Sequence, residues 1–149
     1  MSRRSSPPRS GFTLIEMMVV LAIIGTLALL VAPSVLHNVG DANVTAAKTQ
    51  IEAFAVALDG YRLDTGTYPT TDQGLAALRA RPDSARVGWR GPYLRKAVPL
   101  DPWGRPYVYT APGVHNPDSF DLYTLGKDGV TGGEGEDADI TSWGEKLKP

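Results

Sequence analysis

A single acidic residue stands at the start of a long apolar run near the N-terminus. From Met17 to Leu36 there is no charged residue, and Leu14 and Ile15 extend the run beyond Glu16. About 18 or more apolar residues, at roughly 1.5 Å per helical residue, are enough to cross a hydrocarbon core of about 30 Å. The run therefore predicts a membrane-spanning helix. An ionised carboxylate in hydrocarbon is disfavoured by roughly 2.5 to 3.5 kcal/mol, so we expect Glu16 to have a partner or a task.

The charges outside this run predict its orientation and narrow the class of partner. Arg3, Arg4 and Arg9 precede the run with no acid among them, so the N-terminal arm is predicted to stay in the cytoplasm and the rest to lie outside it. Without these three, 12 of the 15 basic residues remain against 16 acidic residues, a formal charge of −4. Since there is no long basic stripe, we do not expect nucleic acid as a partner.

The chain has no cysteine, although its C-terminal part would lie in a compartment that permits disulfides. A region this small would gain stability from a cross-link between its loops. We therefore expect a metal site to take the place of a disulfide.

The sequence predicts one long helix from Phe12 to about Asp64, after a disordered leader that ends at residue 11. In its second half, residues 41–64, apolar residues recur at spacings of three and four, and charged residues fall elsewhere. The predicted buried stripe is Val44, Ala47, Ile51, Phe54, Leu58 and Tyr61. Pro33, with Gly25, predicts a bend or a weak point, and Gly40-Asp41 could instead split the helix in two.

Turn residues and short apolar runs alternate over residues 65–149. Thr70 to Gln73 offers a capping box for a short helix that would extend to about Ala80. Strands are predicted at 106–111 and 120–125, with a third near 140–143. We expect these strands to form a small antiparallel sheet against the helix stripe, which makes residues 41–149 an α+β head domain.

The segment Gly11-Phe12-Thr13-Leu14-Ile15-Glu16 resembles the signature of type IV pilins and pseudopilins. The resemblance implies that a prepilin peptidase cleaves after Gly11 and that the new N-terminal residue, Phe12, is N-methylated. A secretory signal peptide would have a shorter apolar core, and a plain anchor would have no use for Glu16. Cleavage would create an amine one helical turn from this carboxylate. Glu16 could then pair with the amine of a neighbouring subunit, which would favour assembly, or with its own amine.

Four further segments narrow the resemblance to the major pseudopilins of type II secretion systems. They are Tyr68–Gly74, Gly91–Leu94, Asp101–Tyr107 and Asp121–Gly129. The resemblance implies a pilin-like fold and a single-pass inner-membrane protein that polymerises with itself into a periplasmic pseudopilus. It also implies minor pseudopilins, an assembly ATPase and an inner-membrane platform as partners. Such a filament helps to push exoproteins through an outer-membrane secretin.

Two other functions are compatible with a membrane-anchored head. A type IV pilin on the cell surface shares the N-terminus, but such pilins usually close their C-terminal region with a disulfide. A calcium-dependent hydrolase would need a nucleophile and a base. His37 and His115 are far apart and have no catalytic motif around them, so we expect no enzyme.

The acidic, glycine-rich segment from Asp128 to Asp139 is the candidate metal site. Calcium binds roughly six to eight oxygens, and a loop bent by glycines can gather carboxylates and carbonyls around it. The resemblance implies one Ca²⁺ here, with Asp128, Asp137 and Asp139 as side-chain ligands and the Leu125 and Val130 carbonyls as further ligands. The segment lacks the alternating acids of an EF-hand and the repeats of a β-roll. From the residues alone, a disordered acidic tail is the remaining alternative.

Overall fold

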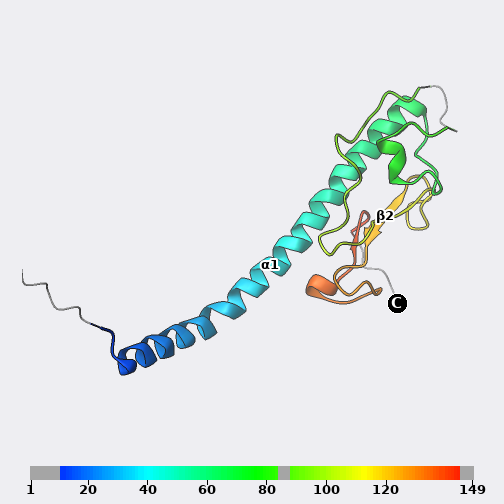
Figure 1. Cartoon of the computed structure of the whole chain (residues 1–149). Helices are drawn as coiled ribbons and strands as arrows, with labels where there is room; N and C mark the ends of the chain where they lie inside the picture. Colours follow the sequence, from blue (N-terminus) through cyan, green and yellow to red (C-terminus); the bar gives the residue numbers. More distant parts are fainter. Residues whose placement is uncertain (1–10, 84–87, 145–149) are drawn as a thin grey trace, which may run out of the picture. The chain divides into compact units, whose positions relative to one another are not determined.

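The computed structural model describes residues 11–83 and 88–144, without the side chains of residues 30–38 (Figure 1). The predicted leader, residues 1–11, therefore lies outside the described part except for Gly11. The chain divides into two compact units, residues 1–38 and 39–149, which we describe separately.

One helix, α1, runs from Leu14 to Thr65 without a break. It continues through Pro33 and through Gly40-Asp41, which confirms the prediction of a single helix over that of a split one. A hydrogen bond from Gly66 N to the Arg62 carbonyl, at 2.8 Å, marks its end. At the positive φ of 85° that Gly66 adopts, a glycine readily terminates a helix.

In the first unit, α1 carries exposed apolar side chains. The exposed large apolar residues up to residue 29 are Phe12, Leu14, Ile15, Met17, Met18, Val19, Val20, Leu21, Ile23, Ile24, Leu27 and Leu29. The predicted membrane-spanning segment, residues 12–40, includes the side chains that the structure does not describe. Among the residues that it does describe, no helix has the length and apolar character needed to cross a membrane.

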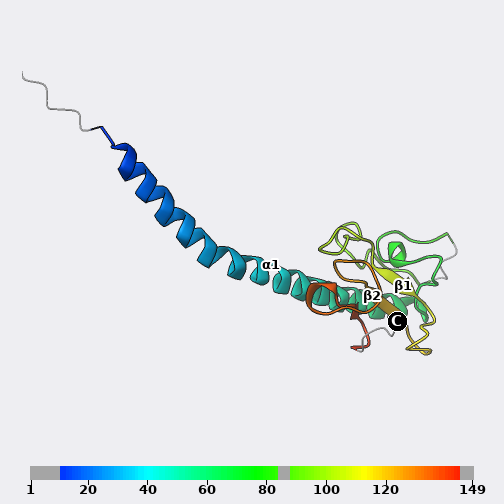
Figure 2. The same ribbon diagram turned by 90° about the horizontal axis from the view of Figure 1, so that it is seen from below.

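In the second unit, one side of α1 is buried against the rest of the head (Figure 2). Ala47, Phe54 and Leu58 are completely buried, and Ile51 and Tyr61 nearly so. The predicted stripe is therefore confirmed, with Val44 at its partly buried start. The charged residues predicted to lie off the stripe are exposed: Lys48, Glu52, Asp59 and Arg62.

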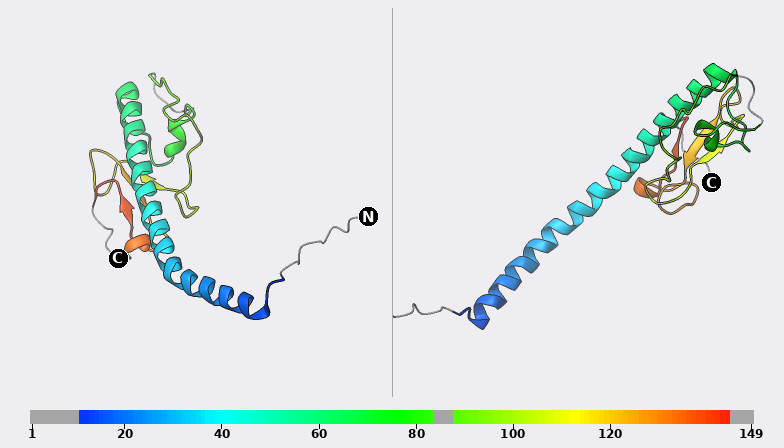
Figure 3. Two further views of the ribbon diagram at one scale, coloured as in Figure 1. Left: turned by 90° about the vertical axis from the view of Figure 1, so that its left-hand side faces the viewer. Right: turned by 45° about the horizontal axis from the view of Figure 1, so that its top comes forward.

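A three-stranded antiparallel sheet forms the layer opposite the helix (Figure 3). Its strands are β1 (Val108–Thr110), β2 (Asp121–Thr124) and β3 (Ile140–Thr141), in the spatial order β1-β2-β3. Tyr109 pairs with Leu122, and Thr124 with Ile140. Leu122 is fully buried and faces the helix core, so the predicted α+β architecture is confirmed with shorter strands.

The predicted helix after Thr70 is only partly correct. Its capping box forms, because Gln73 Oε1 accepts from Thr70 N at 2.9 Å and Thr70 Oγ1 accepts from Gln73 N at 3.3 Å. The helical part is instead a four-residue 3₁₀ helix, η1 (Leu75–Leu78). The Leu78 carbonyl accepts hydrogen bonds from Tyr93 N and Leu94 N, at 2.8 and 3.2 Å. Hydrogen bonding to this distant loop replaces the next helical turn.

Aromatic rings fill the space between helix and loops. Phe54 meets Tyr107 edge to face at a centroid distance of 5.2 Å, and Tyr68 meets Phe120 at 5.0 Å. The Tyr109 hydroxyl is buried and donates to the Pro69 carbonyl at 2.8 Å. Burial raises the pKa of Tyr107 to about 12 and that of Tyr109 still further. These rings pack the loops and the sheet onto the helix.

Candidate functional site

The residues predicted to be processed and to direct assembly lie just before α1 and in its first turn. Gly11 and Phe12 precede the helix and are exposed, Phe12 to 77%. Thr13 caps the helix, because its Oγ1 accepts a hydrogen bond from Glu16 N at 3.3 Å. Thr13 and Glu16 have the spacing of a capping box, a pattern from which this cap could have been predicted. The predicted cleavage point thus lies in exposed chain directly before a capped helix.

Glu16 lies in this first turn and is exposed. An acid there interacts favourably with the positive end of the helix dipole. Because its side chain is exposed, it can reach a positive group on another molecule.

The acidic loop, residues 125–139, contains one carboxylate with an unusual environment. Asp139 is only 7% exposed. Its Oδ2 accepts a hydrogen bond from Gly132 N at 2.7 Å, whereas Oδ1 is buried with no hydrogen-bond partner in the described part of the chain. A buried carboxylate oxygen that accepts no hydrogen bond is unfavourable unless a cation binds it. Asp139 therefore fits the predicted role of a cation ligand.

The other two predicted carboxylate ligands have more exposed positions. Asp128 is exposed, and its Oδ1 accepts from Val130 N at 3.0 Å, which closes a local turn. Asp137 is half-buried in the short 3₁₀ helix η2 (Gly135–Asp137). Across the described ranges, no three Asp, Glu, His or Cys side chains form a group that could hold a metal ion. Any cation bound here would therefore depend on backbone carbonyls as well.

Glycines bring such carbonyls together. A Cβ atom on Gly126 would lie 2.7 Å from the Glu136 carbonyl oxygen and 2.8 Å from that of Ala138. A Cβ on Gly133 would overlap with the Asp137 carbonyl. These glycines adopt φ values of 66° and 79°, which other residues rarely adopt. The loop is thus folded tightly, with several carbonyl oxygens close to its two glycine bends.

The acidic loop is also fastened to α1 within the second unit. Gly40 is buried beneath the Glu136 side chain, and a methyl group on Gly40 would overlap with it. Glu136 Oε2 forms an ion pair with Lys127 Nζ at 3.0 Å, and Lys127 N donates to the Glu136 carbonyl at 2.9 Å. The missing side chain of Gly40 makes room for this contact.

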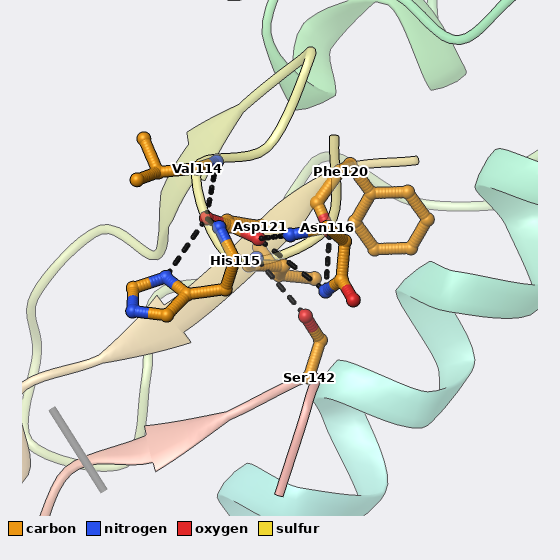
Figure 4. Close-up of polar contacts among 7 residues, drawn as sticks. Val114, His115, Asn116, Phe120, Asp121 and Ser142 are labelled. Atoms are coloured by element: carbon orange, nitrogen blue, oxygen red, sulfur yellow. Dashed lines mark hydrogen bonds and ion pairs between the residues drawn. The ribbon is translucent and has the colours of Figure 1, made fainter. Parts of the chain in front are cut away.

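A second buried carboxylate, Asp121, organises the loop that connects β1 and β2 (Figure 4). Its Oδ2 accepts from Val114 N and His115 N, each at 2.8 Å, and lies 3.1 Å from His115 Nδ1. Its Oδ1 accepts from Asn116 N at 3.1 Å and from Asn116 Nδ2 at 3.3 Å. The His115 ring stacks on Trp143 at 4.2 Å, which joins this loop to the segment after β3.

Two opposing effects act on the pKa of Asp121. Burial raises it, and the hydrogen bonds from His115, Val114 and Asn116 lower it. The hydrogen bonds outweigh burial, so the pKa of Asp121 lies below its ordinary value. Asp121 and His115 could not be predicted as partners from the sequence, because nothing in their spacing distinguishes them from other loop residues.

Family comparisons agree with both halves of the chain. Residues 34–143 match the family model described as "Type II secretion system (T2SS), protein G". Residues 7–32 match the model of the prokaryotic N-terminal methylation motif. The second match covers the predicted cleavage and methylation point.

Individual relatives give the same result over nearly the whole length. The type II secretion system core protein G of Pseudomonas aeruginosa is 51% identical over 137 residues, 91% of this chain and 95% of that protein. Its namesake from Vibrio cholerae is 47% identical over 91% of this chain and 92% of that protein. The crystal structure of the major pseudopilin from enterohaemorrhagic Escherichia coli matches with a TM-score of 0.59 and 34% identity. That match covers 72% of this chain and 92% of the other. The chain therefore belongs to the type II secretion system protein G family.

Proposed function

We propose that this protein is the major pseudopilin of a type II secretion system, a structural subunit that polymerises into the pseudopilus and helps to drive exoproteins through the outer membrane. The observation that carries the proposal is the exposed apolar surface formed by Phe12 and by α1 up to Leu29. An exposed surface of this kind marks a membrane or protein contact. Family membership favours a secretion filament over a cell-surface pilus and a structural role over an enzymatic one.

In this proposal the chain is first a single-pass inner-membrane protein with its head in the periplasm. Prepilin peptidase removes residues 1–11 and methylates Phe12, and the match to the methylation motif supports this step. The membrane platform then adds subunits to the filament together with the minor pseudopilins. Packing apolar helices against one another keeps their side chains away from water. The amine of Phe12 in one subunit and Glu16 of its neighbour neutralise each other in the filament core.

We further propose that the acidic loop binds one Ca²⁺. The unpaired Oδ1 of Asp139 and the carbonyls gathered at the glycine bends support this. Asp139 would hold the ion with its buried side chain, and Leu125 and Val130 with their carbonyls. Asp128 and Asp137, which form no three-acid group with Asp139 in the described structure, would move towards the ion when it binds and add their side chains. The ion would add a cross-link between loop segments that have no disulfide. Calcium here has a structural role.

Deleting the gene and measuring secreted enzymes in the culture medium tests the main proposal. We expect secretion to stop and to return when the unsubstituted gene is supplied. When the Glu16→Ala gene is supplied, we expect the subunit to insert into the membrane but to form few filaments and to restore little secretion. The amine of Phe12 then has no carboxylate to neutralise it. Filaments are counted by electron microscopy after overproduction.

The matched control is Glu52→Ala, which makes the same change on an exposed face of α1 in the second unit. It is expected to support filaments and secretion. Normal secretion by the deletion strain would overturn the proposed function. Normal assembly of Glu16→Ala would leave the filament role in place and remove the role given to Glu16.

Calcium should stabilise the full chain in detergent. At a free concentration of 100 times the Kd, one bound ion adds about 2.7 kcal/mol to the free energy of unfolding. We expect chelation to lower the melting temperature, and Asp139→Asn to abolish most of this difference. Asparagine can still accept from Gly132 N, but it replaces the unpaired oxygen with a group that cannot bind a cation.

The control for this experiment is Glu134→Gln, at an exposed acid of the same loop. Its calcium-dependent rise in melting temperature should equal that of the unsubstituted chain. Identical melting curves in chelator and in millimolar calcium would show that the unsubstituted chain binds no calcium ion.

A further inference from the structure

Arg105 connects the turn that precedes β1 to the start of the acidic loop. Its Nη1 donates to the carbonyl oxygens of Gly126 and Lys127, each at 2.7 Å. Both bonds are short and charge-assisted, so they are stronger than bonds between neutral groups. The two acceptors are consecutive residues, 21 and 22 positions away along the chain. One guanidinium thus fixes two successive peptide planes of the loop.

The guanidinium also contacts the next turn of the same loop. A Cβ atom on Gly129 would lie 2.9 Å from both Cζ and Nε of Arg105, so the glycine backbone lies directly against this group. Gly126 and Gly129 adopt φ values of 66° and 71°. Glycines have more conformational freedom than other residues, so this part of the loop needs outside contacts to keep one shape. Arg105 supplies such contacts at both ends of the Gly126–Gly129 turn.

Asp101 in turn fixes Arg105. Its Oδ1 accepts from Arg105 N at 2.8 Å, and its own N donates to the Arg105 carbonyl at 2.8 Å. The other oxygen, Oδ2, accepts from the hydroxyl of Thr124, the residue immediately before the acidic loop. Asp101 is 4% exposed, so these bonds are shielded from water. One buried carboxylate therefore holds both the arginine and the first residue before the loop.

We infer that Arg105 is a positioning residue for the cation site of the acidic loop. It binds the Gly126 and Lys127 carbonyls and so keeps them from a cation, whereas these bonds do not involve the Leu125 and Val130 carbonyls, which the family resemblance suggests as ligands. A carbonyl bonded to a guanidinium is a poor ligand for a second cation, because the two positive charges would repel each other at that distance. The inference rests on the calcium proposal above and extends it to a residue outside the loop.

Two effects of Arg105 on calcium affinity oppose each other. Its positive charge repels a nearby cation, but the side chain is partly exposed and water weakens this repulsion. Its hydrogen bonds restrict the loop before the ion arrives, and this lowers the entropy lost on binding. We expect the second effect to dominate, so removing the arginine should weaken binding.

Calcium titration of the full chain in detergent by isothermal calorimetry tests the inference. Removing a group that orients metal ligands typically raises the Kd by about 10-fold or more, and we expect this for Arg105→Gln. Arg105→Lys should give an intermediate Kd, since the ammonium group can still donate to a carbonyl. Arg79→Gln makes the same change at an exposed arginine in another loop and should leave the Kd unchanged.

The outcomes separate this inference from the calcium proposal. If the unsubstituted chain binds no calcium, both are wrong. If it binds calcium and Arg105→Gln binds it equally or more tightly, only the positioning role is wrong, even where the variant melts at a lower temperature in chelator. Circular dichroism shows whether Arg105→Gln is folded. If it is not, Arg105→Lys decides alone: a raised Kd supports the role, and an unchanged Kd overturns it.

Discussion

Replacing Phe54 by alanine is expected to lower the free energy of unfolding of the head by about 3–5 kcal/mol. Phe54 is completely buried at the centre of the α1 stripe and meets Tyr107 edge to face at 5.2 Å. Alanine would lose this ring contact and leave a cavity between the helix and the loop before β1. Urea unfolding of the full chain in detergent, followed by tryptophan fluorescence, measures the change.

Val56→Ala is the matched control, because it shortens a side chain on the same helix that is 73% exposed. Its effect should stay within about 0.5 kcal/mol. Equal urea midpoints for Phe54→Ala and Val56→Ala would mean that the stripe does not carry the stability of the head.

Replacing Asp121 by asparagine is expected to lower the free energy of unfolding by about 2–4 kcal/mol. The carboxylate accepts from Val114 N, His115 N, Asn116 N and the Asn116 side chain, and the His115 ring lies beside it. An asparagine has one acceptor oxygen, so its NH₂ group would face backbone donors in a buried place. The same urea experiment measures this loss.

Asp121 also makes stability depend on pH. Its pKa is lowered in the folded chain, so its contribution is present above the unfolded-state pKa of about 3.9 and is lost as pH falls through the lower folded-state value. Between pH 6 and pH 3, the difference between the unsubstituted chain and Asp121→Asn should therefore shrink. Asp118→Asn, at an exposed acid of the same loop, should show no such convergence. A difference that stays constant down to pH 2 would contradict the role of the ionised carboxylate.

The helix and the sheet could be predicted because they depend on repeating patterns. The stripe from Ala47 to Tyr61 follows a spacing of three and four, and every predicted member is buried or partly buried. Strand positions followed from short β-rich runs between turn residues. The strands are shorter than predicted because only three residue pairs join β1 to β2 and two join β2 to β3. The flanking residues of each predicted run have no partner strand in the described part of the chain.

Long-range polar contacts could not be predicted in the same way. Arg105 bonds to carbonyls 21 and 22 residues away, and Thr124 to Asp101 over 23 residues. Such pairs have no periodicity, and the acceptors of Arg105 are backbone atoms that every residue has. The helix predicted to extend from Gln73 to about Ala80 was too long for the same reason. The Leu78 carbonyl accepts hydrogen bonds from the backbone nitrogens of Tyr93 and Leu94, which are distant in the sequence.

The acids of the acidic loop show the same limit. Asp128, Asp137 and Asp139 look alike in the sequence, and family resemblance suggested all three as calcium ligands. The structure separates them, because Asp139 is buried with an unpaired oxygen whereas Asp128 is exposed. Burial depends on the packing of the whole head, which local composition does not specify.

The two outer strands of the sheet are very short, with three residues in β1 and two in β3. An exposed strand edge is a template on which another chain can add a strand and start an aggregate. Edges this short offer few backbone groups for such pairing. The heads of neighbouring copies of the chain are therefore protected from amyloid-like stacking on one another.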